Sequence, residues 1–277
     1  MDHDGDPTGV NRDAVRGPAA FRLGLALFVL LCAQPLSSLN LWASDERPAL
    51  VIIGATAQSA AALIPLAIER GYAVIAVARN PDSLSTRGEH LTVVKGDVYD
   101  RASIEAVLTG RETVIGLIGP RVDPRKDIGQ SDLFATGYAN IVGAMKTRGN
   151  KRLIATSSIG AQIVLTRQPA EDAPRTQQWM WKTRAIYDDM RLMETAVRAS
   201  GLEFTILRPA QLMPEPERHD LQVAVDERAP EFTLITYADF ARFILDNVVA
   251  GEQHIGHTVA LYSDRKLEYG GNFLTGR

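Results

Sequence analysis

Side chains able to bind or react stand directly after the short apolar runs of this chain. Each run is rich in valine, isoleucine or alanine, as buried parallel strands are. The residues that follow these runs are Gly54–Ser59, Arg79, Asp97, Gly119 and the pair Ser157–Ser158. Ligands of open parallel sheets bind beyond the carboxyl ends of the strands. We therefore expect these residues to converge along one rim and to bind a phosphorylated ligand there.

The first of these sites is a turn between a strand and a helix. Ala49–Ile53 is predicted as a strand, and apolar residues then recur at helical spacing from Ala61 to Ile68, ahead of Gly71. A second strand, Ala73–Ala78, completes a right-handed βαβ unit. The first turn of such a helix leaves backbone N–H groups without partners at the positive end of the helix dipole. A phosphate bound at this end accepts hydrogen bonds from these N–H groups, and its negative charge is stabilised by the helix dipole.

The sequence Gly54-Ala55-Thr56 resembles the turn of the atypical short-chain dehydrogenase/reductases, of the NmrA-like and biliverdin/flavin-reductase-like group. Those proteins carry Gly-Ala-Thr-Gly-x-x-Gly, whereas this chain has Ala57 and Ala60 at the second and third glycine positions. Alanine suits the third position, which packs the helix on the strand. The Ala57 methyl stands where a diphosphate would approach, and alanine adopts positive φ only at a cost. The resemblance implies that the phosphate-binding residues are Gly54, Thr56, Ala57, Gln58 and Ser59.

Arg79 indicates which dinucleotide would bind. It follows the second strand in the segment Ala76–Pro81, which resembles the family's Ala-x-x-Arg-Asn-Pro. An acidic residue there would bind the ribose hydroxyls of NAD, whereas an arginine suits the 2′-phosphate of NADP. The resemblance therefore favours NADP (NADPH) over NAD. The alternative is a solvated arginine at a strand end.

Further residues are implied to flank the dinucleotide. Gly96-Asp97-Val98 is similar to the family's Gly-Asp-Val, in which the carboxylate accepts the adenine amino group and the valine covers the ring; the alternative is an Asx-turn. Gly119 ends the fourth strand, where the family's chain passes phosphate and ribose, or it simply makes a turn. Phe204–Ala210 resembles the family's Tyr-Thr-Ile-Leu-Arg-Pro-Gly, which brings Pro209 past the nicotinamide.

The catalytic candidates are two serines and a tyrosine. Ser157 and Ser158 match the family's Ser-Ser-x-Gly beside the nicotinamide, where a hydroxyl could bond the substrate carbonyl. Classical members use Tyr-x-x-x-Lys, in which the lysine lowers the pKa of the tyrosine. Here Tyr187 is followed by Arg191, which does not replace lysine at such a site, and the lysine of the atypical group falls on Met190. Tyr187 is thus a candidate acid without a dependable partner, or an ordinary helix tyrosine.

Strands and helices alternate through the rest of the chain. Further strands are expected at Leu91–Lys95, Thr113–Pro120, Arg152–Ser157, Glu203–Arg208 and Thr258–Leu261, and longer helices at Asp132–Arg148, Arg184–Ser200 and Tyr237–Ala250. This alternation predicts an α/β fold: a Rossmann-type doubly wound parallel sheet of about seven strands with helices on both faces. Gln177–Lys182, with two tryptophans, either walls an apolar substrate site or packs as a flap. The five histidines show no metal-binding spacing.

Residues 1–45 are predicted to be a leader and residues 46–277 the dinucleotide-binding domain. Arg22 precedes the eleven-residue apolar run Leu23–Ala33, which suits a signal-peptide core better than a membrane-spanning helix. Acidic residues ahead of the run, and Leu41 before a cleavage point near Ala43, favour the alternative of an apolar helix that packs on the domain or stays as an anchor. The protein is expected to be exported, periplasmic or membrane-anchored if the run is a signal, and cytoplasmic otherwise.

Composition narrows the function further. The chain has 277 residues, of which 45% are hydrophobic, and a net charge of -3, which suits a globular core and gives nucleic-acid binding no support. Its single cysteine, Cys32, lies in the leader, so the body has neither a disulfide nor a thiolate metal site.

We expect an NAD(P)-binding oxidoreductase that moves hydride to or from a small carbonyl, flavin or quinone-like acceptor, with membrane contact only through the leader. One alternative is a non-catalytic NADP-sensing or scaffold protein of NmrA-like type. The other is an exported Rossmann protein that has lost nucleotide binding.

Overall fold

The computed structural model describes residues 48–120, 128–251 and 253–266. The predicted leader, including Leu23–Ala33, lies outside these residues, and its boundary with the domain remains a prediction. Within the described ranges, no helix combines the length and the apolar character needed to cross a membrane.

The centre of the structure is an eight-stranded sheet, seven of whose strands are parallel, as the alternating sequence predicts. Its order is β3 (Leu91–Lys95), β2 (Ala73–Ala78), β1 (Ala49–Ile53), β4 (Thr113–Gly116), β5 (Arg152–Thr156), β6 (Glu203–Pro209), β10 (His257–Tyr262) and β8 (Gln222–Val225). The edge strand β8 was not predicted and runs antiparallel to β10. The chain moves outward from β1 to β3 and then crosses back to β4, so the strand order reverses between β1 and β4. That reversal is where ligands of such sheets bind.

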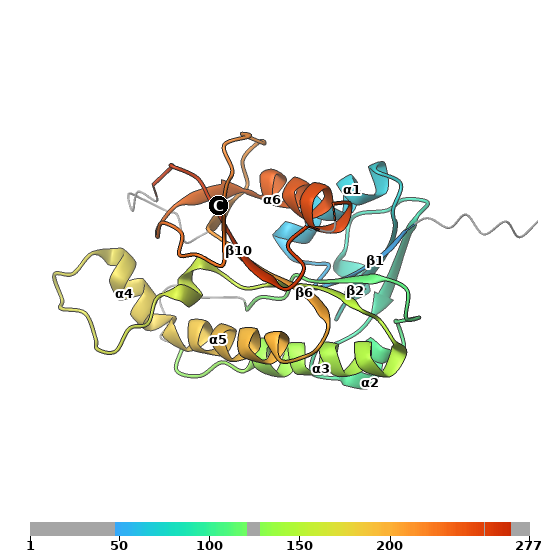
Figure 1. The fold of residues 1–277 in the computed structure, drawn as a ribbon, viewed down its shortest axis with the longest axis horizontal. Coiled ribbons are helices and arrows are strands. Elements are labelled where there is room, and N and C mark those ends of the chain that lie inside the picture. Colours follow the sequence, from blue (N-terminus) through green and yellow to red (C-terminus); the bar gives the residue numbers. More distant parts are fainter. Residues whose placement is uncertain (1–47, 121–127, 252, 267–277) are drawn as a thin grey trace, which may run out of the picture. The chain divides into compact units, whose positions relative to one another are not determined.

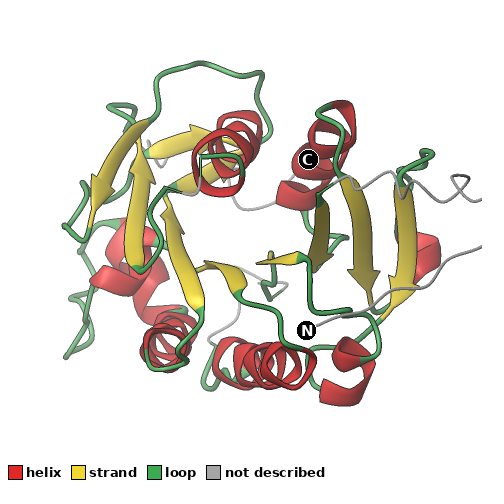
Figure 2. Ribbon diagram, turned by 45° about the vertical axis from the view of Figure 1, so that its right-hand side comes forward, coloured by secondary structure: helices red, strands yellow, loops and turns green. Residues whose placement is uncertain are grey.

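Helices cover both faces of the sheet, which confirms the doubly wound arrangement (Figure 1). On one face α1 (Gln58–Glu69) packs against α6 (Tyr237–Phe243), which continues as a π-helix over Ile244–Val249. The other face carries α2 (Arg101–Glu105), α3 (Leu133–Arg148) and α5 (Arg184–Arg198). Figure 2 shows the strands lying between these two helical layers. Each layer has its own apolar core, because both sides of the central strands are buried.

Smaller elements near the strand ends complete the fold. β7 (Gln211–Met213) and β9 (Leu234–Thr236) form a two-stranded parallel sheet that the sequence did not predict. The tryptophan-rich segment forms a helix, α4 (Arg175–Lys182), directly before α5. A short 3₁₀ helix, η3 (Ile159–Gln162), follows β5. Of these elements, η3 directly follows β5 and β7 directly follows β6.

A buried tyrosine joins the ends of β4 and β5. The Tyr138 hydroxyl, on α3, donates to the carbonyl of Gly116 at 2.8 Å and accepts from the backbone N–H of Thr156 at 2.8 Å. Tyr138 is 0% exposed, and burial raises the pKa of its hydroxyl. A Cβ atom on Gly116 would lie 2.5 Å from this hydroxyl, so glycine is needed there. The tyrosine thereby fixes the spacing of two strand ends that border the candidate site.

Tyr138→Phe is expected to lower the free energy of unfolding by about 1–3 kcal/mol, because it leaves the part-buried N–H of Thr156 without this acceptor. Urea denaturation followed by circular dichroism measures the change. Tyr99→Phe is the matched control: the Tyr99 hydroxyl also donates a hydrogen bond, to Asp132 at 2.9 Å, but the residue is 48% exposed and its loss should cost less than about 0.5 kcal/mol. Equal losses in the two variants would contradict the account.

Candidate functional site

A cavity of about 1190 Å³ lies along the carboxyl ends of the parallel strands, on both sides of the strand-order reversal. Pockets for a single drug-sized ligand measure about 300–1,000 Å³, so this cavity has room for a dinucleotide and a second small molecule. All the residues predicted from the sequence to bind or react line it. They are Gly54, Thr56, Ala57, Gln58, Ser59, Arg79, Asp97, Val98, Gly119, Ser157, Ser158, Tyr187 and Pro209.

The turn after β1 is built on one glycine. Gly54 has φ +88, and a Cβ atom there would lie 2.5 Å from the carbonyl oxygen of Leu117. The backbone N–H groups of Gly54 and Ala55 both donate to the carbonyl of Val77 at 3.1 Å. These contacts hold the turn close to the ends of β2 and β4, and only glycine fits the first position.

The structure corrects one part of the argument about Ala57. This residue is the N-cap of α1 with φ -70 and ψ 151, an extended conformation that alanine adopts without strain. The expected cost of positive φ therefore does not apply, and only the bulk of the methyl group remains. Ala60 is 0% exposed in the core, as expected for a packing position. No side chain caps the N-terminus of α1, which leaves its first-turn N–H groups available to an anion.

A tyrosine side chain from α6 reaches the same turn. The Tyr237 hydroxyl donates to Gln58 Oε1 at 2.6 Å, and burial raises the pKa of Tyr237. Both residues line the cavity. The bond uses the Gln58 side chain as an acceptor, so both its amide N–H groups and the backbone N–H of Gln58 can still donate.

The ends of β2 and β3 carry two of the charged residues of the described lining, Arg79 and Asp97. Arg79 is exposed, and no hydrogen bond or ion pair holds its guanidinium among the described residues. Asp97 Oδ1 accepts from the backbone N–H of Tyr99 at 3.0 Å, which is the Asx-turn that was the alternative interpretation. Val98 is 8% exposed beneath this turn. A Cβ atom on Gly119 would meet nothing within 4 Å, so the wall is open there.

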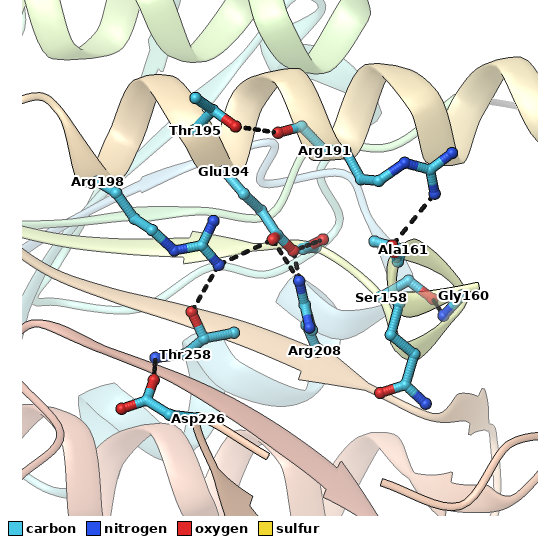
Figure 3. A network of polar contacts seen from close by, with 12 residues as sticks. Ser158, Gly160, Ala161, Arg191, Glu194, Thr195, Arg198, Arg208, Asp226 and Thr258 are labelled. Atoms are coloured by element: carbon cyan, nitrogen blue, oxygen red, sulfur yellow. Dashed lines mark hydrogen bonds and ion pairs between the residues drawn. The ribbon is translucent and has the colours of Figure 1, made fainter. Parts of the chain in front are cut away.

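The two candidate serines differ in what their hydroxyls do. Ser158 Oγ accepts from the backbone N–H of Gly160 at 3.1 Å and caps η3 (Figure 3). Ser157 is 4% exposed, and its Oγ donates to Glu194 Oε1 at 2.7 Å. Ser157 therefore lines the cavity while its hydroxyl is bonded to a buried carboxylate. This arrangement suits a positioning role better than contact with a substrate carbonyl.

Glu194, on α5, is the centre of a buried polar network. Arg208 on β6 donates to both its oxygens, at 2.7 and 2.5 Å, and Arg198 donates to Oε2 at 3.0 Å (Figure 3). Burial alone would raise the pKa of Glu194, but the hydrogen bonds and charge of Arg208, together with Ser157 and Arg198, outweigh it and the pKa lies below its ordinary value. The network joins α5 to the ends of β5 and β6.

The predicted tyrosine reaches the cavity, but the residues that would assist it do not. Tyr187 lines the cavity, packs edge-on against Trp179 with ring centroids 6.3 Å apart, and covers Gly160, where a Cβ would lie 2.2 Å from its ring. Met190 is 8% exposed in the core beneath α5. Arg191 donates to the carbonyls of Ala161 and Ile163 at 3.1 Å and pairs with Asp188. Neither position supplies a cation to the cavity lining.

One group of described side chains has the spacing of metal ligands: Glu217, His219 and Asp239. Asp239 is 4% exposed and accepts from the backbone N–H of His219 at 3.0 Å and from Thr236 Oγ1 at 2.6 Å. Arg242 pairs with Glu217. These contacts give the carboxylates of Glu217 and Asp239 a structural role at the start of α6.

Comparison with known proteins identifies the family. Residues 54–250 match the NAD(P)H-binding family, and the chain belongs to it. A short-chain dehydrogenase/reductase from Veillonella parvula, solved in complex with NADP, superposes with a TM-score of 0.63 at 18% identity, covering 82% of this chain and 99% of that one. An anaerobillin reductase from Escherichia coli O157:H7 gives 0.58 at 17% identity, covering 78% and 97%. These structures show that the chain shares their Rossmann fold.

Curated relatives match a shorter part of the chain. Cinnamoyl-CoA reductase 1 of Petunia hybrida is 29% identical over 118 residues, which cover 40% of this chain and 35% of that protein. Cinnamoyl-CoA reductase 1 of Arabidopsis thaliana is 23% identical over 194 residues, covering 63% and 55%. The matched region thus spans about a third to a half of these relatives. The chain has an NAD(P)-binding, oxidoreductase-like fold.

Two buried carboxylates near the site were missed from the sequence. Glu194 and Asp189 both lie on the buried side of α5, among Met190, Met193 and Val197. Asp189 accepts from the backbone N–H groups that begin α3, including Phe134 at 2.9 Å. In the sequence, these two carboxylates recur at helical spacing with apolar residues, which indicates that they lie on the buried face of the helix. Because buried charges are usually paired, this pattern could have predicted a buried ion pair.

Glu194→Gln is expected to lower the free energy of unfolding by about 3 kcal/mol near neutral pH, because it leaves the guanidinium of Arg208 without its buried counter-charge. The folded-state pKa of Glu194 lies below its ordinary value of 4.5, so its stabilisation is present above 4.5 and is lost as the pH falls through the folded pKa. The difference in the free energy of unfolding between wild type and Glu194→Gln should therefore become smaller as the pH falls. Chemical denaturation at several pH values measures this difference.

Glu105→Gln is the control for this prediction. Glu105 lies 3.9 Å from Arg101, and its side chain is 33% exposed, so its removal should cost less than about 1 kcal/mol. If the difference in the free energy of unfolding between wild type and Glu194→Gln stays constant from neutral to acid pH, ionised Glu194 does not supply the stabilisation.

Proposed function

We propose that the protein binds NADP(H) in preference to NAD(H) and is a reductase of the short-chain dehydrogenase/reductase class. The observation that carries the proposal is that Arg79 lines the same cavity as the turn at Gly54 and forms no ion pair among the described residues. A guanidinium suits a phosphate monoester through paired N–H donors. NAD(P)H, when bound, supplies the hydride.

The turn after β1 fits the diphosphate of such a dinucleotide. The uncapped first turn of α1 offers the backbone N–H groups of Gln58 and Ser59, and Gly54 lets the backbone come close. Thr56 is exposed at the same turn and adds a hydroxyl. The Ala57 methyl narrows this space, while the backbone of Ala57 is unstrained.

The adenine is proposed to lie at the ends of β2 and β3. Asp97 keeps its second carboxylate oxygen, Oδ2, for an amino group, because only Oδ1 is bonded among the described residues. Val98 forms an apolar floor and Tyr99 is exposed beside it. The nicotinamide then lies between Gly119 on one side and Ser158 and Pro209 on the other, where the walls are formed by the ends of β4, β5 and β6.

Arg79→Ala is expected to weaken NADPH binding at least about tenfold and to leave NADH binding nearly unchanged, because a charge-assisted hydrogen bond to the 2′-phosphate is lost. Isothermal titration calorimetry of the purified chain measures both affinities. Arg87→Ala, at an exposed arginine outside the cavity lining, is the control. Equal weakening of both coenzymes by Arg79→Ala, or none, would refute the NADP assignment.

Ala57→Gly is expected to strengthen the binding of NADPH and NADH alike, by roughly two- to tenfold, since the methyl group obstructs a diphosphate that both coenzymes share. The same titration measures this change. An unchanged affinity would refute the steric role given to Ala57.

A second candidate function is a non-catalytic NADP sensor. It is supported by the burial of Met190 and by the hydrogen bonds of Arg191 to backbone carbonyls, since neither of these two positions supplies the cation that a catalytic tyrosine at 187 would use. NADPH oxidation assayed against carbonyl, flavin and quinone acceptors separates the two functions. Binding without oxidation of NADPH would favour the sensor, and turnover with any acceptor would reject it.

A further inference from the structure

We propose that Phe232 contacts the nicotinamide half of the bound dinucleotide and is held in place for this contact by a strained backbone. This inference rests on the proposed function, because it takes NADP(H) as the ligand. Three observations carry it: the backbone conformation of Phe232, its place in the cavity lining, and the hydrogen bonds that fix the segment around it.

Phe232 has a backbone conformation that its side chain disfavours. Its φ is +57, in the left-handed region, which bulky residues adopt only at a cost. The other described residues with a positive φ, apart from glycines, are His219, Asp226 and His254. Aspartate and histidine are enriched in this region, whereas phenylalanine is an outlier there. Strained residues of this kind cluster at active sites and ligand clamps.

Hydrogen bonds on both sides of Phe232 maintain the strain. On one side, Gln162 of η3 donates through Nε2 to the carbonyl of Ala229 at 2.7 Å and accepts through Oε1 from the N–H of Ala229 at 3.2 Å. On the other side, the carbonyl of Thr233 accepts from the N–H of Gln211 at 3.1 Å. Glycine would adopt the same φ without strain, so the turn alone does not account for a phenylalanine.

The segment from Phe232 to Tyr237 runs along the cavity. Phe232, Thr233 and Tyr237 all line it, and β9 connects them. At one end of the segment, the Tyr237 hydroxyl donates to Gln58, in the turn proposed to bind the diphosphate. At the other end, Thr233 is bonded to Gln211, which lies two residues after the end of β6. The nicotinamide is proposed to lie at the end of β6, so Phe232 belongs to that part of the lining.

An aromatic side chain at this position suits the nicotinamide ring. Phe232 is half-buried, so its side chain packs on the protein and still has surface to offer to a ligand. Aromatic side chains pack well on flat rings, because the buried area is large and the ring electrostatics favour offset or edge-on contact. The fixed backbone orders the side chain before the coenzyme binds, which lowers the entropic cost of binding. The strained conformation therefore preorganises the contact.

Truncation of the ring tests the contact with two ligands that share the adenosine end. NADP⁺ contains the nicotinamide, whereas adenosine 2′,5′-bisphosphate keeps the adenosine and its 2′-phosphate without it. In calorimetry, Phe232→Ala is expected to weaken the binding of NADP⁺ about tenfold and to change that of the bisphosphate less than about twofold. Equal weakening of both ligands, or of neither, would overturn the inference.

Phe204→Ala is the matched control. Phe204 is also half-buried, but it lies on β6 and outside the described lining. Both affinities should therefore stay within about twofold of those of wild type. A loss of NADP⁺ affinity as large as that of Phe232→Ala would contradict the assigned contact.

Phe232→Gly separates the role of the ring from that of the fold. Glycine accepts the positive φ, so this variant should melt about 2–4 °C above Phe232→Ala while losing NADP⁺ affinity by the same factor. With the chain saturated with NADPH, the nicotinamide fluorescence should shift towards that of the free coenzyme. A melting temperature equal to that of Phe232→Ala would contradict the strain, and wild-type affinity and fluorescence would overturn the contact.

Failure of this inference is distinguishable from failure of the proposed function. Binding of NADP⁺ to the wild-type full chain is measured first. If wild type binds NADP⁺ and the Phe232 variants bind it equally well, the contact is wrong and the coenzyme assignment stands. If wild type does not bind NADP⁺, the proposed function fails, and this inference fails with it.

Discussion

The ion pair between Glu194 and Arg208 organises half of the ligand-binding rim. Its carboxylate, 2% exposed, accepts two hydrogen bonds from Arg208 on β6 and one from Ser157 after β5. Taking these charges out of water is costly, and breaking such a pair costs more because one charge is left alone. The pair therefore holds α5 and two strand ends in one arrangement, and Tyr187, also on α5, shares that arrangement.

The other half of the rim depends on a close backbone contact. Gly54 approaches the carbonyl of Leu117 so closely that no side chain fits, and the turn is bonded to the end of β2 through Val77. β1, β2 and β4 thus end at one place, with the uncapped start of α1 beside them. One half of the cavity offers backbone donors and charged side chains, and the other offers aromatic and apolar walls. The half with backbone donors and charged side chains is the one that would bind the phosphates of the proposed dinucleotide.

Much of this could be predicted from the sequence, for identifiable reasons. The buried strands are short runs rich in β-branched residues, which made them recognisable. Because parallel strands have their carboxyl ends at the same edge of the sheet, the convergence of Arg79, Asp97 and Ser158 could be predicted from the order of strands and helices. β8 and the β7–β9 pair could not be predicted, because strands of three or four residues leave no clear period. The partners of Glu194 come from three separate segments, so only the tertiary structure reveals them. The prediction that Ala57 needs a positive φ was wrong, because the spacing of the glycines does not reveal which of these positions has a positive φ. In the structure that position is Gly54.

A crystal structure of the protein with NADP⁺ tests the central claim most directly. The account predicts the diphosphate on the backbone N–H groups of Gln58 and Ser59, the 2′-phosphate on Arg79, and the nicotinamide between Gly119 and Pro209. A crystal grown at millimolar NADP⁺ in which this cavity holds no dinucleotide, or holds one with Arg79 turned away from the phosphate, would contradict it.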